Sequence, residues 1–181
     1  MNNDEFQELL YQIENQGDLK SQDVPNIDLY MDQIMSLFDV YLSDHKRNED
    51  DKLLTKTMIN NYSKVGLLKP IKGKKYSKDH ILQMLLIYSL KNTITLPEIK
   101  TILEPYHEHT NQIEPIYDEF LTMKKDVSHI ITESIVHYIN TKQMELNNQN
   151  DLTLMLLLLC TSSNQLKSIV ESTLDQITEK K

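Results

Sequence analysis

The stretch "TKTMINNYSKVGLLKPIKGKKYSKDH", residues 55–80, decides how this chain is interpreted. The chain has a formal net charge of -8, yet the stretch holds seven lysines and a single acidic residue, Asp79. From Lys52 to Lys78 there are eight lysines and no acid, which gives +8 there and -16 over the remaining residues. A protein with a negative net charge repels phosphate groups. A block of lysines without any acid therefore indicates one positively charged surface on an otherwise negative molecule.

The first part of the stretch predicts a short helix with a defined end. Thr55 is a good N-cap residue, and the apolar residues of the helix 55–64 fall on one side. Gly66 follows as a stop, because glycine readily takes the left-handed conformation that ends many helices. Tyr62 and Leu67 are expected in the core.

The second part predicts a small wing. Pro70 and Gly73 bracket a segment that is too short and too interrupted for a helix. Gly73 is predicted to turn a hairpin whose arms end at Leu68 and Tyr76.

Outside the stretch the chain is predicted to be helical throughout. Three glycines and five prolines in 181 residues are few for a β-rich fold. Ser77 is expected to cap one helix, and Thr95 with Glu98 forms a capping box for the next. The expected helices cover residues 4–16, 27–42, 78–91 and 95–103, then four segments near 113–124, 127–146, 151–160 and 164–178. The breaks between the last three are expected at 147–150 and 161–164.

Composition also limits the cellular setting. The apolar run "LTLMLLLLC", residues 152–160, is about half the length of a membrane-spanning helix, so it is interpreted as a buried helix. It contains the only cysteine, Cys160, which excludes a disulfide framework and suits a reducing compartment. The first residues are acidic and polar, unlike a signal peptide. A cytoplasmic protein with no membrane partner is expected.

No set of residues predicts catalysis. The glycines are isolated, so no glycine-rich loop can hold a phosphate, and a thiol nucleophile is excluded by the predicted burial of Cys160. The sequence "HEH" at 107–109 lacks further ligands for zinc. We therefore expect neither an enzyme, nor a bound metal, nor a cofactor.

The basic block instead predicts contacts with double-stranded DNA. A recognition helix presents polar side chains to base edges in the major groove, while lysines beside it bind phosphates. The expected contact residues are Lys56, Thr57, Asn60, Asn61 and Lys64 on the helix, and Lys69, Lys72, Lys74, Lys75 and Tyr76 on the wing. The alternative is that these lysines only solvate a small helix and a loop, and that Asn61 is a structural residue.

These motifs resemble the MerR-type winged helix-turn-helix. The resemblance covers residues 55–103, about a quarter of the chain. The matching residues are Tyr62, Gly66, Leu67, Leu68 and Pro70, then Lys75, Tyr76 and Ser77, then Leu96, Glu98, Ile99, Ile102 and Leu103. Where that family has an Arg and a Tyr on its recognition helix, this chain has Asn60 and Asn61. The pattern also predicts no single long C-terminal helix of the kind through which MerR proteins pair.

Residues 23–105 are closer still to the domain-of-unknown-function family numbered eighteen thirty-six, which is regarded as MerR-like. The expected fold is therefore mostly α, with a MerR-like winged helix-turn-helix and an all-α C-terminal region. The expected domains are an N-terminal helix and linker at 1–22, the winged domain at 23–105, and the C-terminal region at 106–181.

The resemblance implies a transcriptional regulator that acts as a homodimer; no small-molecule effector can be named from the sequence. The alternative is an adaptor that keeps the fold and binds proteins rather than DNA.

Overall fold

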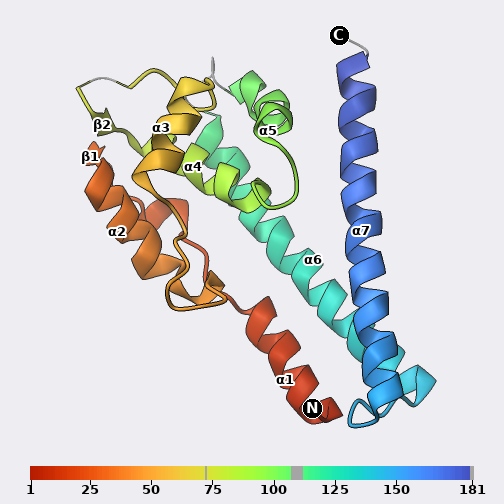
Figure 1. The fold of residues 1–181 in the computed structure, drawn as a ribbon. Helices are drawn as coiled ribbons and strands as arrows, with labels where there is room; N and C mark the ends of the chain where they lie inside the picture. The colour runs from red at the N-terminus through yellow and green to blue at the C-terminus, as the bar shows by residue number, and fades with distance from the viewer. Residues whose placement is uncertain (72, 107–111, 180–181) are drawn as a thin grey trace. The chain divides into compact units, whose positions relative to one another are not determined.

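The computed structural model describes residues 1–71, 73–106 and 112–179. Within these ranges it is mostly helical, as predicted, with one small sheet. The helices are α1 (Asn3–Glu14), α2 (Met31–Tyr41), α3 (Lys56–Lys64), α4 (Lys78–Leu90), α5 (Leu96–Leu103), α6 (Ile113–Lys142) and α7 (Gln149–Glu179) (Figure 1). The strands are β1 (Leu29–Tyr30) and β2 (Lys75–Tyr76), and short 3-10 turns lie at Ser21–Asp23, Ser43–His45 and Glu104–Tyr106.

The chain forms two compact units. The central unit is Gly17–Leu121, and the terminal unit joins Met1–Gln16 to Thr122–Lys181. The terminal unit thus joins the first helix to α7 and to the part of α6 from Thr122 onward, which the sequence pattern did not indicate.

Helix α4 is the centre of the core of the central unit. Every residue from His80 to Ile87 is buried, so this helix is covered on all sides. The other elements contribute buried apolar side chains around it: Ile34 and Phe38 from α2, Ile59 and Tyr62 from α3, and Ile99 and Leu103 from α5. The predicted core residues Tyr62 and Leu67 are both buried.

The helix boundaries predicted from capping residues are confirmed. The Met58 amide donates to the Thr55 hydroxyl oxygen over 3.1 Å at the start of α3. The Thr95 amide donates to Glu98 Oε2 over 2.7 Å at the start of α5. Gly66 ends α3 with φ +72, in the left-handed region where a glycine was expected.

The predicted hairpin is wrong in one arm. Strand β2 pairs antiparallel with β1, with Leu29 opposite Tyr76 and Tyr30 opposite Lys75, rather than with the segment at Leu68. Leu67 and Leu68 are both buried, whereas successive residues of a half-exposed strand point to opposite faces. The turn itself is where it was expected: Gly73 has φ +62, and the next residue, Lys74, has φ 60.

The C-terminal helices are longer than predicted. Two helices, α6 with 30 residues and α7 with 31, replace the four expected segments. The polar residues at 161–164 contain no glycine or proline, and the Thr161 hydroxyl donates to the Leu157 carbonyl oxygen over 2.9 Å within the continuing helix. A break near 147–150 is confirmed, since α6 ends at Lys142 and α7 begins at Gln149.

The terminal unit has its own small core. Phe6 of α1 packs with Ile139, Met144, Leu146 and Met155, where the chain turns from α6 into α7. The Asn3 side chain fixes this turn, because its Nδ2 donates to the Met144 carbonyl oxygen and its Oδ1 accepts from the Leu146 amide.

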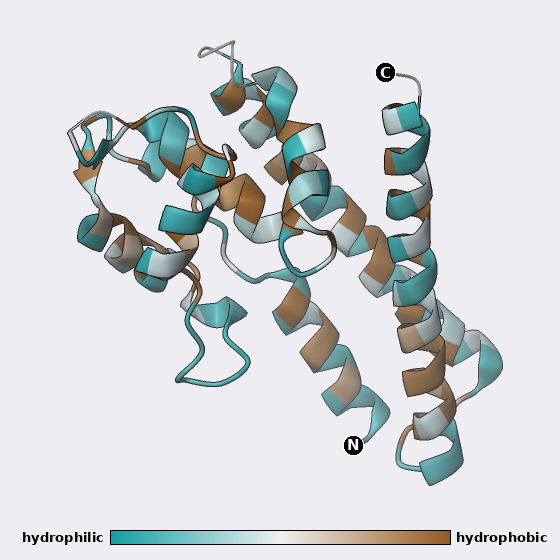
Figure 2. Cartoon of the chain, turned by 45° about the horizontal axis from the view of Figure 1, so that its top comes forward, coloured by the Kyte–Doolittle hydropathy of each residue, from teal (hydrophilic) through white to brown (hydrophobic). Residues whose placement is uncertain are grey.

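The prediction that 152–160 is a buried helix is wrong. Leu154, Leu156, Leu157 and Leu158 are exposed, and so is Cys160. In Figure 2 the hydrophobic residues of α7 are concentrated in its first half. An apolar run on a helix predicts that the helix is covered, but the run does not say by which surface.

Candidate nucleic-acid interface

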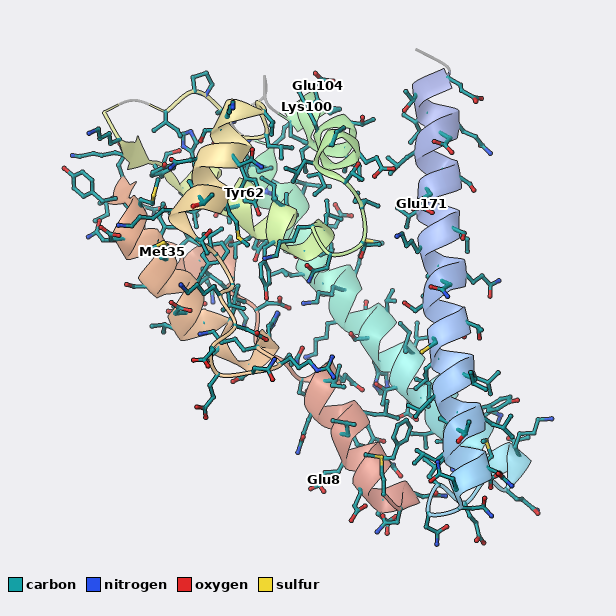
Figure 3. All side chains as sticks on the ribbon, viewed as in Figure 1. Glu8, Met35, Tyr62, Lys100, Glu104 and Glu171 are labelled. Carbon is teal, nitrogen blue, oxygen red and sulfur yellow. The ribbon has the colours of Figure 1, made fainter. Side chains whose placement is uncertain are left out.

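Helix α3 presents one exposed polar face. Thr57, Asn60, Asn61 and Lys64 have the spacing i, i+3, i+4, i+7, which places them in one row, and all four are exposed. We call this row the α3 face. The opposite side is anchored in the core by Ile59, which is fully buried, and by Tyr62 (labelled in Figure 3). The helix contains no acidic residue.

Residues of two neighbouring helices contact α3. Lys91, which directly follows α4, bonds to the chain just before α3, and Asp32 of α2 pairs with Lys56 of α3. Lys91 Nζ donates to the Leu53 carbonyl oxygen over 2.9 Å, two residues before the N-cap of α3. Lys56, also exposed, lies 2.7 Å from Asp32 Oδ1 of α2. The Lys56 charge is therefore shared with an acid, although the pair faces solvent and is weak.

Two of the lysines predicted for the wing, Lys74 and Lys75, are exposed. Lys74 is exposed and makes no ion pair with any described residue. Lys75 Nζ lies 5.4 Å from the centroid of the Tyr30 ring, a cation–π contact across the β1–β2 pair. Lys72, the third predicted tip residue, lies outside the described residues.

Two other predicted wing residues point inward. The Lys69 side chain is only 11% exposed, and its Nζ lies 3.3 Å from Asp79 Oδ2. Tyr76 is 4% exposed and stacks edge-on against His80. We therefore leave both out of the proposed contact surface. Lys78 lies 2.6 Å from Glu114, so the basic block is more paired than its sequence indicates.

His80 bonds to both ends of the segment from Lys69 to Ser77 that was predicted to form the wing, and sequence reasoning missed this role. Its Nδ1 accepts the Ser77 amide over 3.1 Å, so Nε2 carries the proton and donates to the Lys69 carbonyl oxygen over 3.3 Å. The Gln83 side chain adds a third tie, because its Oε1 accepts the Lys69 amide. Burial lowers the pKa of His80, against the smaller opposing effects of the Lys69 carbonyl and Asp79. The neutral ring is thus the form that this geometry needs.

Neither a metal centre nor a membrane segment is found in the part of the chain that the structure describes. No three metal-binding side chains gather within these ranges. The "HEH" motif at 107–109 lies outside them. No described helix combines the length and apolar character that crossing a bilayer requires.

The comparisons with known proteins give one match. The model of the family described as Domain of unknown function (DUF1836) matches residues 19–120, which is almost the whole central unit. No curated protein and no solved structure matches the chain.

Proposed function

The chain belongs to the family described as Domain of unknown function (DUF1836), and on that premise we propose that it binds double-stranded DNA as a MerR-like transcriptional regulator. The central unit would be the winged helix-turn-helix domain, with α3 as its recognition helix and the turn before β2 as its wing. A homodimer would bring two copies of α3 to two half-sites.

The α3 face is the observation that carries this proposal. Four polar side chains in one row, without an acid, suit the major groove, which carries the distinguishable pattern of base edges. Asn60 and Asn61 can each pair with an adenine through two hydrogen bonds, and their exposure leaves both amides available. Lys64 lies at the same face and suits a phosphate.

The wing would add contacts that do not depend on sequence. Lys74 and Lys75 lie together at the exposed turn, and lysines at such a position bind the phosphate backbone and release counterions. The contact set that we propose is Lys56, Thr57, Asn60, Asn61, Lys64, Lys74 and Lys75.

The test is binding to DNA from upstream of the protein's own coding region, compared with a scrambled duplex. We expect the wild type to prefer the upstream DNA. The variant Asn60→Ala/Asn61→Ala should lose that preference, by about 1–3 kcal/mol for each base contact removed, and keep its affinity for scrambled DNA. Gln7→Ala/Gln16→Ala, on the terminal unit, is the control. Equal binding to both duplexes by the wild type would contradict the proposal.

The second candidate is an adaptor that keeps the fold and binds a protein. Exposed apolar residues on and beside α2 favour it, Ile27 and Val40 above all. Heparin mimics the charges of DNA, so an adaptor that does not bind DNA should elute from a heparin column at low salt. The variant Val40→Glu should abolish binding of an adaptor to its protein partner and leave any DNA binding unchanged.

A further inference from the structure

The start of α2 lies beside both parts of the proposed contact surface. Tyr30, the last residue before α2, is opposite Lys75 in the β1–β2 pair, and Lys75 Nζ lies 5.4 Å from the centroid of the Tyr30 ring. Two residues further along the chain, Asp32 Oδ1 lies 2.7 Å from Lys56 Nζ at the start of α3. Because β1 runs directly into α2 (Figure 1), one short segment contacts a lysine before α4 and a lysine of α3.

Asp32 brings a negative charge to a helix that has none of its own. Helix α3 contains no acidic residue. Lys56 and Asn60 are four residues apart, so they are neighbours on the surface of α3, and the Lys56–Asp32 pair lies next to the α3 face. A phosphate that approaches Lys56 would therefore meet the Asp32 carboxylate, and two negative charges repel each other.

The Lys56–Asp32 pair is open to solvent. Its side chains are 59% and 73% exposed, whereas those of the Lys69–Asp79 pair are 11% and 27% exposed. An exposed ion pair contributes little to stability, because water solvates both charges. A phosphate group can therefore displace Asp32 from Lys56 without disturbing the fold.

We propose that Asp32 competes with DNA phosphate for Lys56 and so lowers the affinity of the chain for every duplex, whatever its sequence. The inference rests on the proposed function and says how tightly the same surface binds. Phosphate contacts supply nearly all of the affinity for non-specific DNA, whereas contacts with base edges distinguish one sequence from another. An acid that neutralises one phosphate-binding lysine therefore weakens non-specific binding and leaves the preference set by Asn60 and Asn61 unchanged.

The opposite role for Asp32 would be to aim Lys56 at a phosphate. That role predicts the opposite sign, because removing the carboxylate would then weaken DNA binding. The geometry favours competition, since Asp32 bonds to Lys56 Nζ, which is the group that a phosphate would bind.

The first test removes the carboxylate and keeps its shape. Asp32→Asn frees Lys56 for one more phosphate contact, so the slope of log affinity against log salt should become steeper by about 0.9. Over a fourfold rise in salt, the variant should therefore lose about 3.5-fold more affinity than the wild type. At low salt it should bind the upstream and the scrambled duplex more tightly than the wild type does, by the same factor for both.

Asp39→Asn is the matched control. It makes the same change of charge on the same helix, but Asp39 pairs with Lys46 over 3.1 Å, and Lys46 is outside the proposed contact set. Its slope should equal that of the wild type. A slope as steep as that of Asp32→Asn would show an effect of net charge and would overturn the proposal.

Replacing Lys56 separates competition from repulsion at a distance. In a Lys56→Gln background, Asp32→Asn frees no lysine, so it should not change the slope. An equal steepening in that background would overturn the proposal. Both side chains are exposed, so far-UV circular dichroism should stay unchanged in every variant.

The results also separate this inference from the proposed function. A wild type that binds DNA, with an Asp32→Asn variant of equal or shallower slope, would overturn the competition alone. A wild type and an Asp32→Asn variant that both fail to bind any duplex would overturn the proposed function together with this inference.

Discussion

Removing the two wing charges should change the salt dependence of DNA binding by a calculable amount. Lys74 has φ 60, so Lys74→Gly removes its charge without straining the turn, and Lys75→Gln keeps the stem that lies on Tyr30. Each phosphate contact contributes about 0.9 to the slope of log affinity against log salt. The double variant should therefore have a slope shallower by about 1.8, which is a roughly 12-fold smaller loss of affinity over a fourfold rise in salt.

The assay is fluorescence anisotropy of a labelled duplex, titrated at several salt concentrations for each protein. Two control variants remove a lysine that is not expected to contact DNA. Lys125→Gln removes an exposed charge from the terminal unit and should leave the slope unchanged. Lys69→Gln breaks the partly buried pair with Asp79, so it should lower the free energy of unfolding and leave the slope unchanged. A double variant with the parental slope would refute the proposed contact of Lys74 and Lys75 with phosphates, because neither substitution adds a charge that could replace the two removed.

Three further predictions concern the scaffold of the site. The lowered pKa of His80 means that the unfolded chain binds more protons between that pKa and about 6.5, so the free energy of unfolding should decrease as pH falls through this window. His80→Gln, which keeps a capping acceptor, should flatten this dependence in urea unfolding at pH 7 and pH 5, and an unchanged dependence would exclude His80 as its source. Gly66→Ala should lower the free energy of unfolding by about 1–2 kcal/mol, because alanine is strained at φ +72, and no loss would show that the backbone relaxes. Ile59→Ala should lower it by about 2–5 kcal/mol in thermal or urea unfolding, since the side chain that anchors α3 is fully buried; a loss below about 1 kcal/mol would contradict that packing.

The features that depend on neighbours in the sequence could be predicted. Thr55, Ser77 and Thr95 bond within the next three residues, so their caps were visible in the residue order. The exposed row from Thr57 to Lys64 follows from helical spacing once Ile59 and Tyr62 are placed inside.

The features that depend on distant segments could not be predicted in this way. The partner of β2 lies before α2, and no local signal links Leu29 to Tyr76. The acids that pair with Lys56 and Lys78 are Asp32 and Glu114, both remote in sequence, so a count of local charges overstated the free basic surface.

The α7 error has a different physical origin. The apolar run at 152–160 predicted burial, but a sequence pattern does not say whether the same chain supplies the covering surface. In the folded chain Leu154 and Leu157 are exposed, so the chain does not cover them itself.

Selection from a pool of random duplexes tests DNA readout most directly. The wild-type protein should enrich a motif that contains adenine at the positions opposite α3, and Asn60→Ala/Asn61→Ala should lose the preference at those positions while still retaining DNA. A wild-type protein that retains no duplex, or that enriches no motif in repeated rounds, would contradict a sequence-reading role for the α3 face.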